Sequence, residues 1–213
     1  AGSGIFAIPS YISTKYPENL TNAIICIAVG AILTFLITFI WVKASDFEDE
    51  SISIDGNKEV IDLGSVGNGE IIPISEVPDP TFSQKILGEG VAINITDGAV
   101  YSPVDGTVEV VLESGHSVGL RSSDGVELLI HVGVDTVDLK GKYFKTLVNQ
   151  GDNVKKGDML IQFDYQKIKE NVEFTSTIVV ITNTNSFSDI KISKKAKVTN
   201  FDKLISVTPL NEQ

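Results

Sequence analysis

The longest apolar stretch of the chain lies in its N-terminal part. It runs from Ile24 to Val42 and contains no charged residue. A run of this length can cross the hydrocarbon core of a bilayer, so we predict one transmembrane helix over about 22–43. Trp41 suits the membrane interface, and Lys43 favours the cytosolic side for that end of the helix. The alternative is a helix buried in a folded core, but no other segment is suited to surround it.

Behind this run the pattern changes twice. Residues 44–69 are acidic and contain Ser and Gly with little periodicity, which is typical of a linker. Residues 70–213 show short β-branched runs separated by turn signals such as TDG, PVDG, SSDG, NQGD and KKGD. We therefore predict an all-β domain, an antiparallel β-sandwich. Two brief segments, SQKIL after Pro80 and YQKIKENV at Tyr165, are the candidates for helix.

The charge limits the kinds of partner that the chain can bind, and the cysteine content limits the disulfides and metal sites that it can form. A formal net charge of -11 repels nucleic-acid phosphates and favours a partner with a basic surface. Cys26 is the only cysteine, so one chain forms neither a disulfide nor a cysteine-based zinc site, which fits a reducing compartment.

The chain begins without Met inside the apolar stretch AGSGIFAIPSYI, with no signal-peptide pattern. We therefore expect 1–43 to be the end of a membrane domain that begins upstream of residue 1.

The two histidines of the chain lie on either side of a hairpin signal. The segment HSVGLRSSDGVELLIH reads as strand, turn and strand, because Asp and Gly at Asp124-Gly125 tolerate tight turn geometry. A turn centred between Ser123 and Asp124 places His116 directly opposite His131. Opposed residues project from one face with Cβ atoms about 5 Å apart. Only an odd shift of the register would separate their faces.

Alternation along the second strand of this hairpin divides its residues between two faces. The apolar face, which we expect to be core, holds Val126, Leu128, Ile130, Val132 and Val134. The other face holds His131 with Leu129 before it and Asp135 beyond it, a mixed surface open to a partner. The alternative is that two surface histidines are opposed by chance.

Two opposed imidazoles suit three kinds of chemistry. They can supply two ligands to zinc, with carboxylate, water or partner ligands completing a tetrahedral site. They can act as general acid and base, because their pKa values lie near working pH. One ring nitrogen can also attack phosphorus while the other ring donates a hydrogen bond to the phosphoryl oxygens. No Walker loop and no kinase signature is present in the sequence, which argues against a nucleotide donor.

Two other classes of protein share part of the pattern. The turn-rich runs SPVDGTV and GDNVKKGDMLIQF are similar to biotinyl and lipoyl carrier domains. Those carriers need a modified lysine at a hairpin tip in a Met-Lys or Asp-Lys setting, and no lysine here has that context. Zinc peptidases of a related sandwich need an HxH ligand pair, but position 133 is glycine.

Several blocks in order give the sequence a specific resemblance. EVPDPTFSQKILGEGVAI, SPVDGTV, ELLIHVGVDTVDLKGKYF, GDNVKKGDMLIQFD and VVITN, from about Gly69 to Asn183, resemble the IIA domain of the glucose family of the phosphoenolpyruvate-dependent sugar phosphotransferase system. The resemblance implies that His131 accepts phosphate from the small carrier HPr and passes it to a cysteine of an EIIB domain. It implies that His116 steadies the phosphoryl group with the hydroxyl of Ser114. The family usually has Thr at the latter position and Ala where this chain has Ser117.

The same resemblance implies the remaining features of the site and its setting. The fold would be the EIIA-glucose sandwich with a duplicated hybrid motif, working through a phosphohistidine without a required cofactor. HPr and EIIB would dock in turn on a surface whose members are Phe82, Ile86, Leu112 and Leu129, with Asp79 and Asp135 as acidic contacts for basic residues. The alternative for each of the four apolar residues is that it packs in the core. The alternative for Asp135 is that its carboxylate is simply solvated at the end of the strand.

The segment 1–43 resembles, more weakly, the end of an EIIC sugar permease of the β-glucoside and sucrose branch. That arrangement implies a domain held at the cell membrane on its cytoplasmic side, with the EIIB domain and the sugar-binding EIIC body outside this sequence. The family also implies a second function, a regulatory EIIA module that binds metabolic enzymes or permeases. In that case His116 and His131 would share zinc with the partner.

Overall fold

The structure is a computed structural model that describes residues 59–200 and 202–210. The predicted transmembrane segment 22–43 and most of the predicted linker 44–69 lie outside these residues. Among the residues that the structure does describe, no helix is both long enough and apolar enough to span a bilayer.

The described chain is built from short strands with brief helical turns between them, as the spacing of its turn signals predicts. The elements in chain order are β1 Ile61–Gly64, β2 Gly69–Pro73, η2 Ile74–Glu76, α2 Pro80–Ser83, β3 Glu89–Ile95, β4 Ala99–Tyr101, β5 Gly106–Val111, β6 Ser117–Ser122, β7 Glu127–Val132, η3 Thr136–Leu139, β8 Phe144–Thr146, β9 Asn153–Val154, β10 Met159–Phe163, α3 Tyr165–Lys169, β11 Thr177–Ile181, η4 Thr184–Ser186, β12 Phe187–Ile192, β13 Lys197–Val198 and β14 Lys203–Pro209. All strand pairs among them are antiparallel. The all-β antiparallel prediction is therefore confirmed, whereas the duplicated-motif sandwich stays a prediction.

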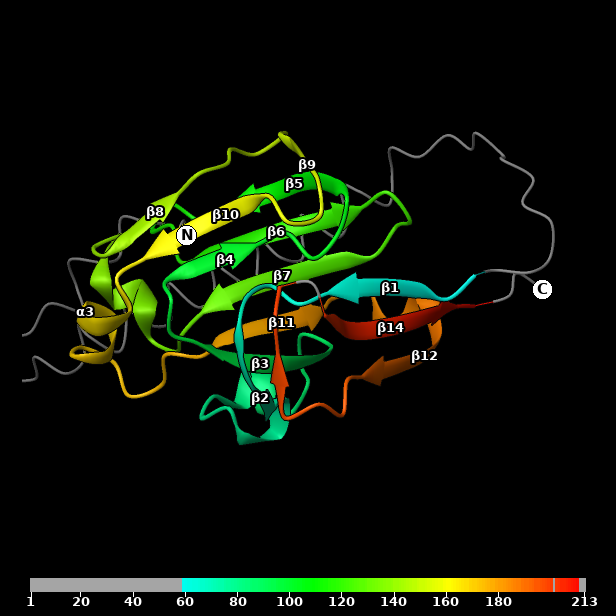
Figure 1. The fold of residues 1–213 in the computed structure, drawn as a ribbon, viewed down its shortest axis with the longest axis horizontal. Coiled ribbons are helices and arrows are strands. Elements are labelled where there is room, and N and C mark those ends of the chain that lie inside the picture. The colour runs from blue at the N-terminus through cyan, green and yellow to red at the C-terminus, as the bar shows by residue number, and fades with distance from the viewer. Residues whose placement is uncertain (1–58, 201, 211–213) are drawn as a thin grey trace, which may run out of the picture. The chain divides into compact units, whose positions relative to one another are not determined.

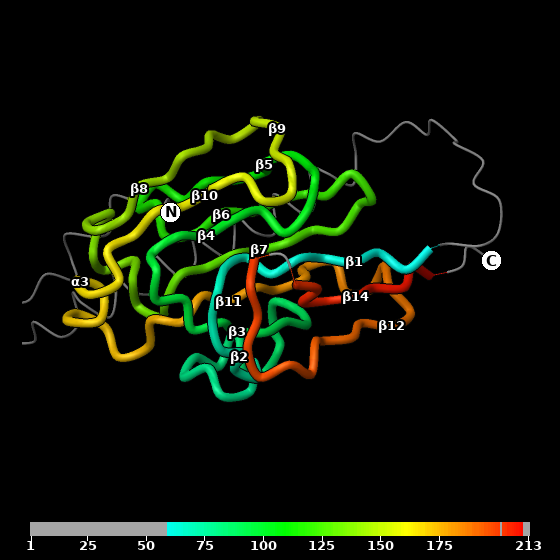
Figure 2. The backbone as a smooth tube through the Cα atoms, viewed as in Figure 1, coloured from blue at the N-terminus to red at the C-terminus, as the bar shows by residue number. Residues whose placement is uncertain are grey.

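The strands form three sheets. The largest has eight strands in the order β13-β2-β3-β11-β7-β6-β5-β9, and two three-stranded sheets have the orders β4-β10-β8 and β1-β14-β12. Figure 1 shows β5, β6 and β7 running side by side, with β1, β14 and β12 gathered as a separate small sheet. The backbone trace in Figure 2 follows the chain through the same strands from β1 to β14.

Two apolar clusters hold the sheets together. The larger joins all three sheets through fully buried residues such as Leu63, Ile130 and Leu160. The smaller lies under η2 and α2, where Ile74 and Phe82 pack against Ile178 and its neighbours. Because the alternate residues of β7 point into the larger cluster, the predicted core face of that strand is confirmed.

The folded region begins earlier than the sequence pattern indicated. The linker was expected to end at 69, but residues 61–64 form β1, which pairs with β14. Leu63 is only 1% exposed, so this strand belongs to the core. A four-residue strand of the composition IDLG is too short to show an alternation, and only its distant partner strand reveals it.

The two predicted helices are present but shorter or displaced. The SQKIL segment was expected to be helical, whereas α2 covers Pro80–Ser83 and ends before most of that segment. Asp79 caps the helix by accepting a hydrogen bond from the Thr81 N–H. Lys85 then adopts a left-handed φ of 58°, which ends any continuation. The second helix, α3, covers Tyr165–Lys169 with Asp164 as its cap.

Candidate functional site

The hairpin between β6 and β7 has a longer loop than predicted. Gly125 adopts φ 81° and donates its N–H to Ser122 O over 3.0 Å, so the loop contains three residues. This turn pairs Ser117, not His116, with His131. The predicted register was therefore wrong by one residue. A glycine at the third loop position favours the three-residue turn, because it takes positive φ without strain.

The two imidazoles nevertheless meet, because His116 lies just before β6 and not within it. Gly115 bends the chain with φ 68°, and the His116 carbonyl accepts the Val132 N–H over 2.9 Å. The ring centroids of His116 and His131 are 4.5 Å apart, with an angle of 78° between the ring planes. The strict alternation that would have separated the faces does not apply to a residue outside the strand.

One ring nitrogen of His131 makes a hydrogen bond to the backbone, and the other keeps its lone pair. Its Nδ1 lies 2.8 Å from the Gly133 carbonyl oxygen, and a carbonyl only accepts, so Nδ1 carries the proton. Neutral His131 therefore keeps the lone pair on Nε2. Burial lowers the pKa of His131, although the Gly133 hydrogen bond and the charge of Asp79 both raise it. His131 as a residue is half-buried, whereas His116 is fully buried.

His116 is more deeply enclosed than its neighbour. Its side chain is 2% exposed, and burial, followed by the proximity of His131, lowers the pKa of His116 to about 3. The ring is therefore neutral at physiological pH. Ser114 Oγ lies 2.6 Å from His116 Nδ1. When this hydroxyl donates to Nδ1, the proton of the ring sits on Nε2, where it can serve a ligand as a hydrogen-bond donor.

Two phenylalanines support the histidine pair. The Phe82 ring lies 5.4 Å from the His131 ring, and the Phe144 ring lies 6.2 Å from the His116 ring, both measured between centroids. Phe82 is only 6% exposed, and its ring lies against that of His131. Its role in partner docking stays a prediction. The sequence did not single out Phe144, because an aromatic residue in a short strand is ordinary core.

The other predicted docking residues differ in exposure. Ile86 is 68% exposed and Leu112 is 39% exposed, whereas Leu129 is half-buried beside the smaller apolar cluster. Leu112 accepts the Gly115 N–H over 2.8 Å, so it belongs to the turn that leads into His116. Leu129 shares its strand face with His131, which the alternation predicted.

The two predicted acidic residues lie on different segments near the site. Asp79 caps α2, and its charge acts on His131. Asp135 is exposed and adopts φ 59° immediately before η3. This 3-10 turn carries Val137, which is 56% exposed. Sequence reasoning did not single out Val137 as exposed, because the left-handed Asp135 ends the alternation two residues before it.

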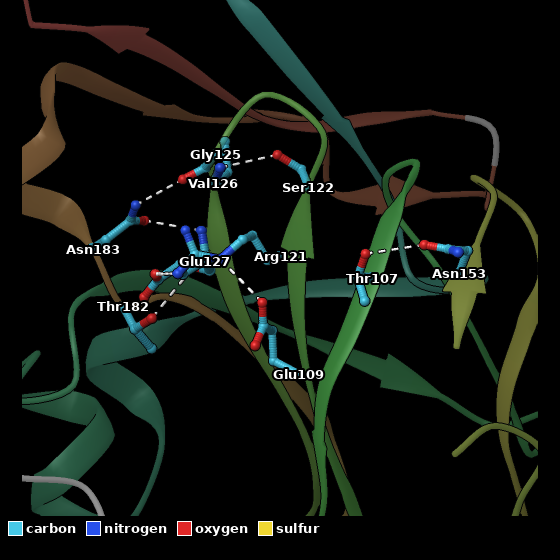
Figure 3. Close-up of polar contacts among 10 residues, drawn as sticks. All are labelled: Thr107, Glu109, Arg121, Ser122, Gly125, Val126, Glu127, Asn153, Thr182 and Asn183. Carbon is cyan, nitrogen blue, oxygen red and sulfur yellow. Dashed lines mark hydrogen bonds and ion pairs between the residues drawn. The ribbon is translucent and has the colours of Figure 1, made fainter. Parts of the chain in front are cut away.

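A polar network at the far end of β7 fixes the hairpin that carries His131 (Figure 3). Arg121 pairs with Glu109 over 3.0 Å and with Glu127 over 2.5 Å, which links β5, β6 and β7. Asn183 accepts the Glu127 N–H over 3.0 Å and donates to the Gly125 carbonyl over 2.9 Å. The Asn183 side chain therefore ties the tip of the hairpin to the end of β11, a role that the sequence alone did not indicate.

The site offers two ring nitrogens but no complete metal site. Within residues 59–200 and 202–210, no group of three or more His, Cys, Asp or Glu side chains converges. The site therefore offers the neutral imidazole of His131 as a nucleophile, beside the neutral imidazole of His116 as a hydrogen-bond donor. Ser117, which follows His116, is fully buried, and its hydroxyl donates to the Ile130 carbonyl over 2.9 Å. The polar side chain at this position is therefore satisfied.

Comparison with known proteins identifies the family of this site. The family model described as "phosphoenolpyruvate-dependent sugar phosphotransferase system, EIIA 1" matches residues 61–187. A glucose-specific EIIA component of Staphylococcus epidermidis is 44% identical over 141 residues, which are 66% of this chain and 85% of that protein. A glucose-specific EIICBA component of Staphylococcus carnosus is 39% identical over 173 residues, which are 78% of this chain but only 26% of that protein.

A solved structure agrees with the sequence comparisons. The glucose permease IIA of Mycoplasma capricolum superposes with a TM-score of 0.67 at 29% identity. The superposition covers 72% of this chain and 99% of that one. The matched region of the family model includes both histidines and the whole hairpin that carries them.

Proposed function

The chain belongs to the EIIA 1 family of the phosphoenolpyruvate-dependent sugar phosphotransferase system, and we propose that it carries the phosphoryl group on Nε2 of His131. The phosphocarrier function in sugar uptake follows from the family, and the assignment to one atom is the proposal. The observation that carries it is the bond from Nδ1 to the Gly133 carbonyl, which leaves the lone pair of Nε2 free beside His116.

The transfer needs little covalent machinery. The phosphorus–nitrogen bond in a donor phosphohistidine breaks as the bond from phosphorus to His131 Nε2 forms, and the donor ring, protonated at its other nitrogen, leaves as a neutral imidazole. In the second step the bond to Nε2 breaks as phosphorus bonds to the thiolate sulfur of the acceptor cysteine, and His131 is released as a neutral imidazole that keeps its Nδ1 proton. Both steps depend on positioning and on stabilising the charge of the phosphoryl oxygens.

His116 and Ser114 would provide that stabilisation. With the Ser114 hydroxyl donating to Nδ1, the proton of the His116 ring sits on Nε2, and the centroid of this ring lies 4.5 Å from that of the His131 ring. This donor can bind a phosphoryl oxygen on His131. Because burial keeps the pKa of His116 low, the ring donates without carrying a charge that would hold the phosphoryl group too tightly.

We infer that the donor is HPr and that the acceptor is an EIIB domain, docking in turn over the histidines. Ile86 after α2, Leu112 after β5 and Val137 in η3 provide exposed apolar side chains, and Asp79 and Asp135 offer charges to a basic partner. The predicted helix at 22–43 would hold the domain on the cytoplasmic side of the membrane, behind an EIIC permease body. The chain spans about a quarter of the fused EIICBA relative, so the activity of a complete permease is itself a proposal.

The test is phosphorylation with purified Enzyme I, HPr and phosphoenolpyruvate. The unmodified chain is expected to take up one phosphoryl group, and His131→Ala is expected to take up none. His116→Ala should still be labelled but should transfer the group poorly to EIIB, because the acceptor nitrogen remains while the donor to the phosphoryl oxygens is lost. Full labelling of His131→Ala would exclude the assignment.

The paired rings also favour a second function, regulation through zinc shared with a partner. Two imidazoles 4.5 Å apart can supply two ligands, and the described residues contain no third one nearby, so a partner carboxylate would complete the site. Pull-down of the unphosphorylated chain with and without zinc tests this. Capture of the same partner in both conditions, or only by the phosphorylated chain, would exclude zinc-bridged regulation.

A further inference from the structure

The strand that carries His131 ends in two peptide units that together aim the Gly133 carbonyl at the His131 ring. Each peptide unit is planar, so its C=O and its N–H turn together. The first unit contains the Val132 carbonyl and the Gly133 N–H. The second contains the Gly133 carbonyl and the Val134 N–H. The orientation of these two planes therefore decides where the acceptor for His131 Nδ1 lies.

Three of the four polar groups in these units are bonded by backbone groups or by the imidazole itself. The Gly133 N–H donates to the Ser176 carbonyl over 3.1 Å, and the Val134 N–H donates to the Phe174 carbonyl over 2.9 Å. The Gly133 carbonyl lies 2.8 Å from His131 Nδ1, from which it accepts a hydrogen bond. The second plane is thus held at both ends, by the segment before β11 and by the ring.

The fourth group, the Val132 carbonyl, is bonded by the side chain of Thr136. The Thr136 hydroxyl donates to this carbonyl over 2.7 Å, which is the usual separation for a hydroxyl and an acceptor oxygen. Thr136 is 0% exposed, so this bond is shielded from bulk water. Together with the bond to Ser176, it holds the first plane at both ends.

A glycine between the two planes makes the bond to Thr136 important. Gly133 has φ 73°, and glycine lacks the Cβ that restricts backbone rotation in other residues. The Thr136 methyl lies against this glycine, because a Cβ added to Gly133 would be 2.6 Å from Thr136 Cγ2. Without the hydroxyl, the first plane would depend on the longer bond to Ser176. Rotation at Gly133 would then turn its carbonyl away from His131.

The Gly133 carbonyl matters because it decides which nitrogen of His131 carries the proton. The hydrogen bond made by one ring nitrogen sets the tautomer of a neutral imidazole. Here that bond keeps the proton on Nδ1 and the lone pair on Nε2. A ring released from the carbonyl would exchange its proton between the two nitrogens. The form with the proton on Nε2 cannot attack phosphorus with that atom.

We propose that Thr136 is a positioning residue for phosphoryl transfer, whose hydroxyl holds the Val132–Gly133 peptide unit so that His131 keeps its Nε2 lone pair. This role rests on the proposed function, because the lone pair matters only if Nε2 accepts the phosphoryl group. A buried hydroxyl needs a hydrogen bond wherever it lies, so the bond by itself assigns no role. The role follows from the acceptor, which belongs to the peptide unit next to the carbonyl that holds the ring.

The neighbouring strand β11 supplies a matched control for Thr136. Thr177 pairs with Val132 in the ladder between β11 and β7, and it is also 0% exposed. Its hydroxyl has no hydrogen-bond partner among the residues that the structure describes. Thr136→Val and Thr177→Val therefore make the same change next to the same β7 residue, but only the first removes a hydrogen bond.

The tautomer is read by NMR of the full chain in detergent micelles at pH 8, with histidine as the only nitrogen-labelled residue. The chain contains two histidines, and the signals of His116 are assigned by their loss in His116→Gln. A ring nitrogen without a proton resonates far downfield of one that carries a proton, so the Nε2 shift reports the ratio of the tautomers. The unmodified chain is expected to show an unprotonated Nε2 on His131.

Thr136→Val should lower the ratio of the Nδ1–H form to the Nε2–H form of His131 about fivefold, the shift in an equilibrium that the loss of one hydrogen bond gives. Thr136→Ser keeps the hydroxyl and should show the same Nε2 shift as the unmodified chain. Thr177→Val should also leave this shift unchanged. Thr136→Cys has a weaker donor and should fall between the serine and valine variants, so it decides the question if the valine variant does not fold.

An unchanged Nε2 shift in Thr136→Val, or in Thr136→Cys where the valine variant is unfolded, would overturn the role of Thr136. A serine variant that shifts as far as the valine variant would overturn it as well, because methyl packing and not the hydroxyl would then hold the peptide unit. So would an equal shift in Thr177→Val. A chain that has an unprotonated Nε2 on His131 but takes no phosphate from HPr would instead refute the proposed function and leave the role of Thr136 in setting the tautomer intact.

Discussion

Acid should weaken the fold through His116 in a way that one substitution removes. The folded chain keeps this ring neutral, with a pKa lowered to about 3 by burial first and by His131 second, whereas the ordinary value is 6.5. Between these two values the unfolded chain binds more protons than the folded chain, so stability falls as pH falls below 6.5. The slope is about 1.4 kcal/mol per pH unit. His116 alone therefore costs about 2 kcal/mol at pH 5 relative to pH 8.

His116→Gln is the perturbation that isolates this effect, because glutamine can still bond to Ser114 and cannot be protonated. Urea unfolding of both proteins is followed by circular dichroism from pH 8 to pH 5. Stability of the unmodified chain should drop about 2 kcal/mol more than that of the variant over this range. His131 and the carboxylates are common to both proteins, so their titration largely cancels. Parallel pH profiles would refute a buried, neutral His116.

Three further substitutions test the contacts around the site. Thr177→Val should stabilise the fold by about 1 kcal/mol in urea unfolding, because the Thr177 hydroxyl is buried without a hydrogen-bond partner; a loss of stability would show that the hydroxyl is bonded. Asn183→Ala should cost about 1–3 kcal/mol, since it leaves a backbone N–H and a carbonyl of the hairpin unpaired; an unchanged thermal midpoint would contradict this. Gly133→Ala should slow phosphorylation of His131 severalfold, because φ is 73° and an added Cβ would lie 2.6 Å from Thr136 Cγ2, displacing the carbonyl that holds Nδ1. Gly151→Ala is the matched control, with φ 91° and open space around it, and should label at the normal rate.

Features of the fold that follow from the periodicity of apolar residues could be predicted from the sequence. Alternation along residues 126–134 assigned the core face of β7 and its flanking residues correctly, because every second side chain there is buried in one of the two apolar clusters. It also placed Leu129 and His131 on one face. The turn signals predicted short antiparallel strands for the same reason, since Gly and Asp residues mark the loops between them.

Features that depend on one residue of loop length, or on a distant partner, could not be predicted. The hairpin loop includes Gly125 as a third residue, which moves the partner of His131 from His116 to Ser117. The two rings meet only because Gly115 turns the chain before β6 begins. β1 is recognisable only through β14, and Asn183 acts on a hairpin that lies far away in the sequence.

The central claim is that the phosphoryl group is attached to Nε2 of His131, and the position of this bond can be measured directly. The chain is phosphorylated with Enzyme I, HPr and phosphoenolpyruvate, digested at alkaline pH and mapped by tandem mass spectrometry, with phosphorus NMR assigning the ring nitrogen. The account predicts a single phosphohistidine at His131, attached through Nε2. Phosphate on His116, or attachment at Nδ1 of His131, would contradict it.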